Sequence, residues 1–319
     1  MKTIFYQNKA ETNKIRKAFK FYYTEKFFNK WMSKYDFPEL NYQQKNFIMR
    51  RWWSDGDVAC SRVDTSDKEL AGLIQDDIVD LKENSIIFTP WTPSGGVGTT
   101  GLYNIYDYPV SVRLINKRGV KFITDKPLTL DQDVVIGYAQ KNKKSVYSSI
   151  EAKLNELVDV EMKKRVARKS TAQPWLFTFD PEDEAQVKKL QESLENDNPY
   201  LFTPIKNING VKALSSGANY IVDKLEQDRQ KIENDILTIL GVNNVGIGEK
   251  KEHLIVDEVN ANNEDVEQSS YSYKNEIEEF FDRVYKVLGY KVSVIDLNDM
   301  TSDTENINQE EEEPQDDME

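Results

Sequence analysis

The stretch that decides the fold, residues 216–242, reads SGANYIVDKLEQDRQKIENDILTILGV. Its apolar residues recur every three or four positions, which is the spacing of one face of an α-helix: Ile221, Leu225, Ile232, Ile236, Ile239 and Leu240. Gly241 follows this stripe, and glycine often ends a helix because it readily adopts the left-handed conformation needed there. The pattern predicts a long amphipathic helix over residues 217–242.

A second long helix is predicted upstream, over residues 143–171. Its apolar stripe comprises Val146, Ile150, Leu154, Leu157, Val158 and Met162. The helix ends in a basic cluster: Lys163, Lys164, Arg165, Arg168 and Lys169. The helix dipole favours some bases at this end, but a cluster of this density also indicates an electrostatic surface.

The two helices flank an insertion, residues 172–216, that reads as a small α/β unit. WLFTF is strand-like, residues 182–195 have a short helical pattern, and YLFTP is again strand-like. After the second helix, residues 243–270 form a polar stretch that we expect to be a long loop. A helix over residues 272–288 and a strand over residues 290–297 then follow.

The N-terminal part of the chain predicts a helix and then a small β unit. Residues 12–35 place aromatic and apolar side chains at helical spacing: Ile15, Phe19, Tyr22, Tyr23, Phe27 and Trp31. Residues 85–124 consist of short β-branched and aromatic runs split by Gly and Pro, which favour antiparallel strands. Within them GVGTTG (residues 96–101) resembles a dinucleotide loop, but a strand-like run follows it where a helix is required. We expect a hairpin tip there.

Charge is spread unevenly along the 319 residues, whose net charge is −13. Residues 1–51 hold 12 Lys and Arg against 4 Asp and Glu, whereas residues 301–319 hold 9 acids and no base. An acidic protein is a poor non-specific DNA binder on global charge, and the acidic tail is expected to be disordered. The single cysteine, Cys60, fits a reducing compartment such as the cytoplasm. Neither a signal peptide nor a membrane span is predicted.

The only histidine, His253, precedes five acids within the stretch GEKKEHLIVDEVNANNEDVEQSS (residues 248–270): Asp257, Glu258, Glu264, Asp265 and Glu267. One histidine and one cysteine so far apart argue against zinc, and the acids lack the glycine and spacing of a calcium loop. No catalytic residue, metal or cofactor is assigned. Two alternatives stay open: a metal-dependent nuclease using the 257–267 carboxylates, and a soluble nucleic-acid-binding protein using the basic N-terminal helix.

Several of these segments together resemble a known family. YIVDKL opens the second helix, LTILGVNN closes it, and EKKEHLIVDEVNANNEDVEQSS follows; DQDVVIGY leads into the first helix. These segments, and their order along the chain, resemble the portal protein (head–tail connector, upper collar) of small short-tailed bacteriophages, the podovirus connector family. The resemblance is close over residues 217–297 and looser over residues 131–171.

The resemblance implies an α+β portal fold that assembles into a ring of twelve identical subunits. Residues 143–171 and 217–242 would be the two stem helices, and residues 172–216 the clip, a small α/β insertion. Residues 1–142 would be the wing, with an SH3-like antiparallel β unit, completed by the helix and strand of residues 271–300. Residues 243–270 would be the tunnel loop, ahead of the tail at residues 301–319.

It also implies a function without catalysis. The ring would stand at one vertex of the virion capsid, contact the major capsid protein and the lower collar or tail protein, and guide double-stranded DNA during packaging and ejection. A separate packaging ATPase would dock during assembly, since this chain has no GxxxxGK[ST] phosphate loop. The expected channel bases are Lys224, Lys250 and Lys251, with further basic contacts at Lys212 and in the cluster Lys163, Lys164, Arg165, Arg168 and Lys169.

Overall fold

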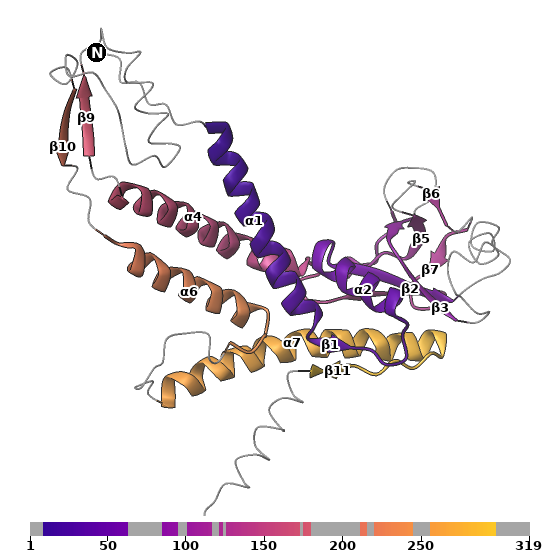
Figure 1. Ribbon diagram of the computed structural model, residues 1–319. Coiled ribbons are helices and arrows are strands. Elements are labelled where there is room, and N and C mark those ends of the chain that lie inside the picture. The colour runs from indigo at the N-terminus through magenta and orange to yellow at the C-terminus, as the bar shows by residue number, and fades with distance from the viewer. Residues whose placement is uncertain are drawn as a thin grey trace, which may run out of the picture. The chain divides into compact units, whose positions relative to one another are not determined.

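The computed structural model describes residues 9–62, 85–94, 101–116, 121–123, 126–172, 175–179, 211–215, 220–244 and 256–297. Within these ranges the chain forms helices and short antiparallel strands (Figure 1). The chain divides into two compact units. Unit 1 comprises residues 1–156 and 231–319, and unit 2 comprises residues 157–230. No helix in the described ranges is long and apolar enough to cross a membrane.

A three-stranded antiparallel sheet lies at the centre of unit 1. β2 (Asp57–Arg62) pairs on one side with β3 (Ile86–Thr89) and on the other with β8 (Val134–Tyr138). The long helix α7 (Val256–Leu288) packs against this sheet, where the ring of Phe280 approaches Gly137. A Cβ at residue 137 would lie 2.5 Å from that ring, so only glycine permits this close approach.

Aromatic rings fill the core around helices α1 (Lys9–Met32) and α2 (Tyr42–Ser54). Asn41 and Gln44 form a reciprocal capping box that starts α2. Trp52 on α2 is fully buried, and its indole Nε1 donates to the carbonyl of Gly137 over 3.2 Å. The N-terminal helix predicted from residue 12 is confirmed and begins at Lys9. Tyr22, expected on its packing face, is instead 59% exposed.

Four further short strands form a second antiparallel group: β4 (Trp91–Pro93), β5 (Ser111–Asn116), β6 (Lys121–Phe122) and β7 (Leu128–Thr129). Its apolar residues share one core with the central sheet: Ala59, Ile87, Val112, Leu114, Ile123, Val134 and Ile136. The small β unit predicted within residues 85–124 is therefore confirmed. Of the predicted hairpin tip, residues 96–101, all but Gly101 lie outside the described residues.

A buried ion pair joins four parts of unit 1. The side chains of Lys34 and Asp296 are both 0% exposed, and Nζ lies 3.8 Å from Oδ2. Asp296 belongs to β11 (Ile295–Asp296), which pairs with β1 (Tyr35–Asp36). The hydroxyl of Ser270 on α7 donates to Asp296 Oδ2 over 2.9 Å. Gly241 has φ +62°, and a Cβ there would lie 2.5 Å from Ser270 N and 2.8 Å from Lys34 Nζ.

Two long helices, α4 (Val146–Ala172) and α6 (Val222–Ile239), each contribute residues to both units. Both confirm the helices predicted from sequence, although α6 is shorter than the predicted range of 217–242. Unit 2 also holds β9 (Trp175–Phe179), paired antiparallel with β10 (Val211–Ser215). β9 was predicted and β10 was not. The predicted helix at 182–195 and the predicted strand at YLFTP lie outside the described residues.

The expectation of a loop through residues 243–270 is wrong in its second half. α7 begins at Val256, so residues 256–270 are helical. Val259, Val266 and Tyr273 recur every seven residues, and Val266 and Tyr273 are buried. This narrow stripe was hidden from the sequence analysis by the acidic and amide residues between its members. The predicted strand over residues 290–297 is reduced to β11.

Breaking the buried ion pair should destabilise the protein strongly. Lys34→Met leaves the carboxylate of Asp296 buried without its cation, so we expect a loss of about 3 kcal/mol or more in the free energy of unfolding, measured by urea denaturation. Lys45→Met is the matched control, because Lys45 pairs with Asp36 near the surface. It should cost less than about 1 kcal/mol. Equal losses for both variants would contradict the role assigned to the buried pair.

Candidate functional site

The site expected to carry function is the pair of helices α4 and α6, together with the bases around them. In unit 1, Lys153 Nζ on α4 lies 2.9 Å from Asp235 Oδ2 on α6. In unit 2, Lys164 on α4 pairs with Glu226 on α6. Also in unit 2, Glu161, which precedes Lys164, lies 3.9 Å from Arg229, which follows Glu226. The two helices are therefore antiparallel there, and we call this pair the hairpin.

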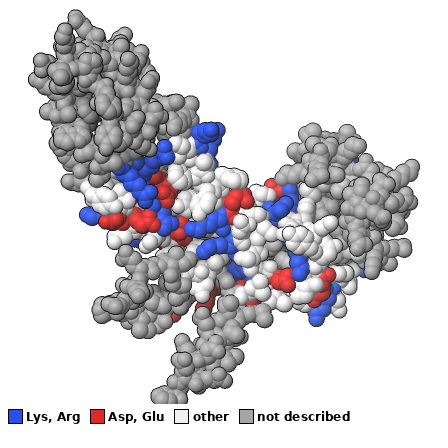
Figure 2. All heavy atoms as spheres, in the orientation of Figure 1, with Lys and Arg blue, Asp and Glu red and all other residues white. Residues whose placement is uncertain are grey.

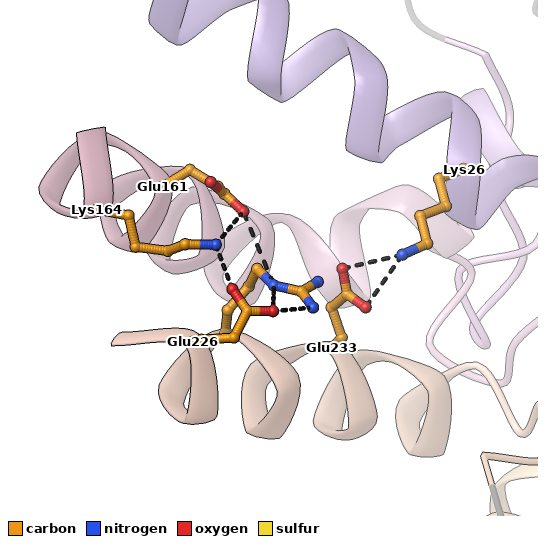
Figure 3. A network of polar contacts seen from close by, with 6 residues as sticks. Lys26, Glu161, Lys164, Glu226 and Glu233 are labelled. Atoms are coloured by element: carbon orange, nitrogen blue, oxygen red, sulfur yellow. Dashed lines mark hydrogen bonds and ion pairs between the residues drawn. The ribbon is translucent and has the colours of Figure 1, made fainter. Parts of the chain in front are cut away.

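The charges that face each other across the unit 2 part of this hairpin neutralise one another (Figure 3). Lys164 is only 5% exposed and contacts both Glu226 and Glu161, the latter over 3.4 Å. Arg229 donates from Nη2 and Nε to Glu226 Oε1 over 2.5 and 2.8 Å. Two bases and two acids thus form a cluster without net charge, as expected for charges removed from water.

In unit 1, α1 is tied to the same two helices by charge. Lys26 Nζ contacts both carboxylate oxygens of Glu233, at 2.9 and 3.0 Å (Figure 3). Glu233 is 3% exposed, so its charge requires this partner. Near the start of α4, Lys20 Nζ lies 3.2 Å from Glu151 Oε1. On the face shown in Figure 2, acidic and basic side chains lie interleaved.

The contacts that Arg229 and Lys164 make with Glu226 lower the pKa of its carboxyl group. The hydrogen bond from Arg229 is the largest cause and that from Lys164 adds to it, and together they lower the pKa of Glu226 to about 2, against the opposing effect of burial. The carboxylate therefore stays charged well below the pH at which ordinary glutamates are protonated. This cluster holds the hairpin together and is not arranged for proton transfer at neutral pH.

The structure separates the predicted bases into three groups. Lys224 on α6 and Lys163, Arg165 and Arg168 on α4 are exposed. Lys164, predicted among the basic contacts, differs from its neighbours, because it is buried and paired with two carboxylates. Lys250 and Lys251 lie outside the described residues. Lys169 and Lys212 lie on α4 and β10, but their side chains are not among those described.

The acids weighed as a metal site are only partly described. Glu264, Asp265 and Glu267 lie exposed on α7, whereas His253 and the side chains of Asp257 and Glu258 lie outside the described residues. In the part of the chain that is described, no group of three or more His, Cys, Asp or Glu residues could hold a metal ion.

A comparison with protein-family models decides the family. The model for Phage Connector (GP10) matches residues 101–301, which is more than half of the chain and includes all of α4, α6 and α7. The chain belongs to the phage connector family. It is thus a head–tail connector, or portal, protein of a bacteriophage. The family is structural rather than catalytic, and it implies a place at the portal vertex of the virion, in association with capsid and tail proteins.

One solved structure is also similar to this connector. A chain of "Portal and tail of native bacteriophage P68" is 12% identical, with 92% of this chain and 91% of that chain covered and a TM-score of 0.43. At that score the similarity adds no argument to the family match.

The sequence analysis missed most of the partners in the ion-pair clusters. Lys26 and Glu233 are 207 residues apart, and Lys164 and Glu226 are 62 residues apart. No local spacing links such positions. The contacts between Glu226 and Arg229 and between Glu161 and Lys164 are local, because residues three apart on a helix are neighbours.

The stability that Glu226 provides should depend on pH. Its folded pKa is depressed, so its contribution is present above the ordinary glutamate value, near 4.5, and is lost as pH falls toward about 2. We expect Glu226→Gln to cost about 1 kcal/mol at pH 7, less than full linkage because the carboxylate is partly exposed. The difference from wild type should shrink between pH 4.5 and pH 2. Asp228→Asn, on the exposed side of α6, is the control. A pH-independent gap between wild type and Glu226→Gln, measured by denaturation, would contradict this.

Proposed function

We propose that twelve copies of this connector form a closed ring whose channel passes double-stranded DNA during packaging and ejection. α4 and α6 would be the stem helices that form the channel wall. The proposal rests on the family match together with the geometry of this hairpin. The charges that face each other inside the hairpin are paired, so only its outward-facing side chains would be available to the channel.

Exposed apolar side chains on the hairpin support packing against further copies. Val166 on α4 is 57% exposed, and Tyr220 and Ile221 before α6 are 59% and 45% exposed. A neighbouring copy packed against the hairpin would cover these side chains. A closed ring buries the same surface on every copy and leaves no open end.

The exposed charges of α6 suit a channel that guides DNA but binds it weakly. Lys224 is exposed on α6, with the exposed acids Asp223 and Asp228 close by in the sequence. Each phosphate that a base neutralises adds affinity through counterion release, which would slow sliding. Isolated bases among acids keep that affinity small. Lys224, Lys250 and Lys251 are the proposed channel bases, and Lys163, Arg165, Arg168, Lys169 and Lys212 are proposed as further basic contacts.

The remaining segments are proposed to take the roles implied by the resemblance. Residues 1–142, with an SH3-like β unit, and residues 271–300 would form the wing. Residues 172–216 would be the clip, facing the tail and, during assembly in the host cytoplasm, a separate packaging ATPase. The tunnel loop would be the part of residues 243–270 that precedes α7. The proposed disordered tail, residues 301–319, lies outside the described residues.

Native mass spectrometry and a single electron micrograph test the ring. We expect a species near twelve times the chain mass of 37.0 kDa and annular particles. A chain that stays monomeric or dimeric at micromolar concentration would sink the proposal.

The channel bases are tested by Lys224→Ala combined with Lys250→Ala and Lys251→Ala. We expect rings of unchanged mass but reduced DNA retention in assembled particles, because the removed charges contact only DNA. Lys144→Ala, at an exposed lysine ahead of α4, is the control and should retain DNA normally. Loss of rings, or full DNA retention in the triple variant, would rule out the channel role of these lysines.

A further inference from the structure

The outer face of α7 carries a regular stripe that nothing else in the described chain covers. Glu264, Tyr271, Glu278 and Tyr285 follow one another at intervals of seven residues. All four are exposed, with Tyr271 at 69% and Tyr285 at 55%. Seven residues are almost two helical turns, so these side chains lie in one line about 31 Å long. The opposite face of α7 packs on the central sheet.

The charge of this stripe is acidic. Asp282 lies one turn beyond Glu278 and is also exposed. Among the described residues, neither Glu264 nor Glu278 makes an ion pair or a side-chain hydrogen bond. Carboxylates that lack a cation alternate here with exposed tyrosines. Exposed aromatic rings are enriched where proteins contact one another, so this face has the character of an interface.

The N-terminal half of α1 carries the complementary pattern. Lys14 and Phe21 are also seven residues apart, and Lys17 lies between them on the same face. Phe21 is 68% exposed and the adjacent Tyr22 59% exposed. Lys14 and Lys17 are exposed, and neither forms an ion pair with the rest of the described chain. Lys14 and Phe21 on α1 are thus separated by the same interval as neighbouring acidic and aromatic positions on α7.

We propose that the α7 stripe of one copy docks against the Lys14–Tyr22 face of α1 on a second copy. Aligning Phe21 with Tyr271 brings Lys14 opposite Glu264 when the helices are parallel, and opposite Glu278 when they are antiparallel. Either alignment places opposite charges beside an aromatic pair. The contact is an interface between neighbours in the ring, so it rests on the proposed function.

The occupant is a second copy because one chain carries both complementary faces and leaves both exposed. Within unit 1 the two helices meet at Trp31 and Tyr273, whose ring centroids are 6.2 Å apart. The half of α1 that carries Lys14 and Phe21 extends away from α7 (Figure 1). The two faces differ, so the contact between copies is heterologous. Such a contact generates a closed ring when the repeated rotation from copy to copy returns to the first copy. DNA as the occupant would use the lysines and be repelled by the α7 carboxylates.

Charge reversal tests the contact. Glu264→Lys with Glu278→Lys should raise the protein concentration needed for half-maximal ring formation at least about tenfold, because like charges then face each other. Asp265→Lys with Glu279→Lys is the matched control. It makes the same charge change on the same helix, one residue further along, which turns the new lysines about 100° off the stripe. Adding Lys14→Glu and Lys17→Glu to the first variant should restore ring formation.

Ring populations are read by native mass spectrometry, and folding is checked by circular dichroism of each variant. Loss of rings in the stripe variant, normal rings in the control and recovery on reversing α1 would support the contact. Normal rings in the stripe variant, or loss without recovery, would overturn it while leaving the ring itself intact. A wild-type chain that forms no ring would overturn the proposed function and this contact together. Rings that form normally in Lys14→Glu with Lys17→Glu but retain less DNA would assign these lysines to DNA and also overturn the contact.

Discussion

The ammonium of Lys34 lies in a region from which water is excluded, and the carboxylate of Asp296 is the charge that offsets its cost. This requirement brings the end of α1, the turn after α6, the middle of α7 and the strand β11 to one place. Unit 1 is built from segments at both ends of the sequence. The aromatic core would attract these segments without fixing how they meet, whereas a buried ion pair has few acceptable geometries.

The same preference for paired charge extends along α4 and α6. Glu226 is paired with Lys164 and Arg229 of its own hairpin, and Glu233 is paired with Lys26 of α1. On these two helices Lys153, Lys164 and Arg229 are paired, whereas Lys163, Arg165, Arg168, Lys224 and Lys231 are exposed. For a head–tail connector, this division separates two tasks, because some charges hold the protein together and others are left to meet partners.

The long helices could be predicted from sequence because their stripes of apolar residues recur at a period that only a helix presents as one face. α7 was mistaken for a loop over residues 256–270 because Val266 is the single buried side chain described there, and acids and amides surround it. β2 escaped prediction because DVACSR is buried along most of its length and shows no alternation of polar and apolar residues. Lys224, expected as a channel base, is exposed on α6, whereas the burial of Lys164 depends on Glu226, which is distant in sequence.

Gly241 and Ser270 meet so closely that a single methyl group would not fit between them. The chain therefore leaves this point after α6 and returns to it within α7. The residues between Gly241 and Ser270 form a closed loop whose two ends are in contact. The free energy of closing such an excursion changes only with the logarithm of its length. A change in the number of residues between Gly241 and Ser270 accordingly costs little free energy, as long as these two residues keep their contact. At residue 241, any side chain larger than hydrogen would push these two segments apart.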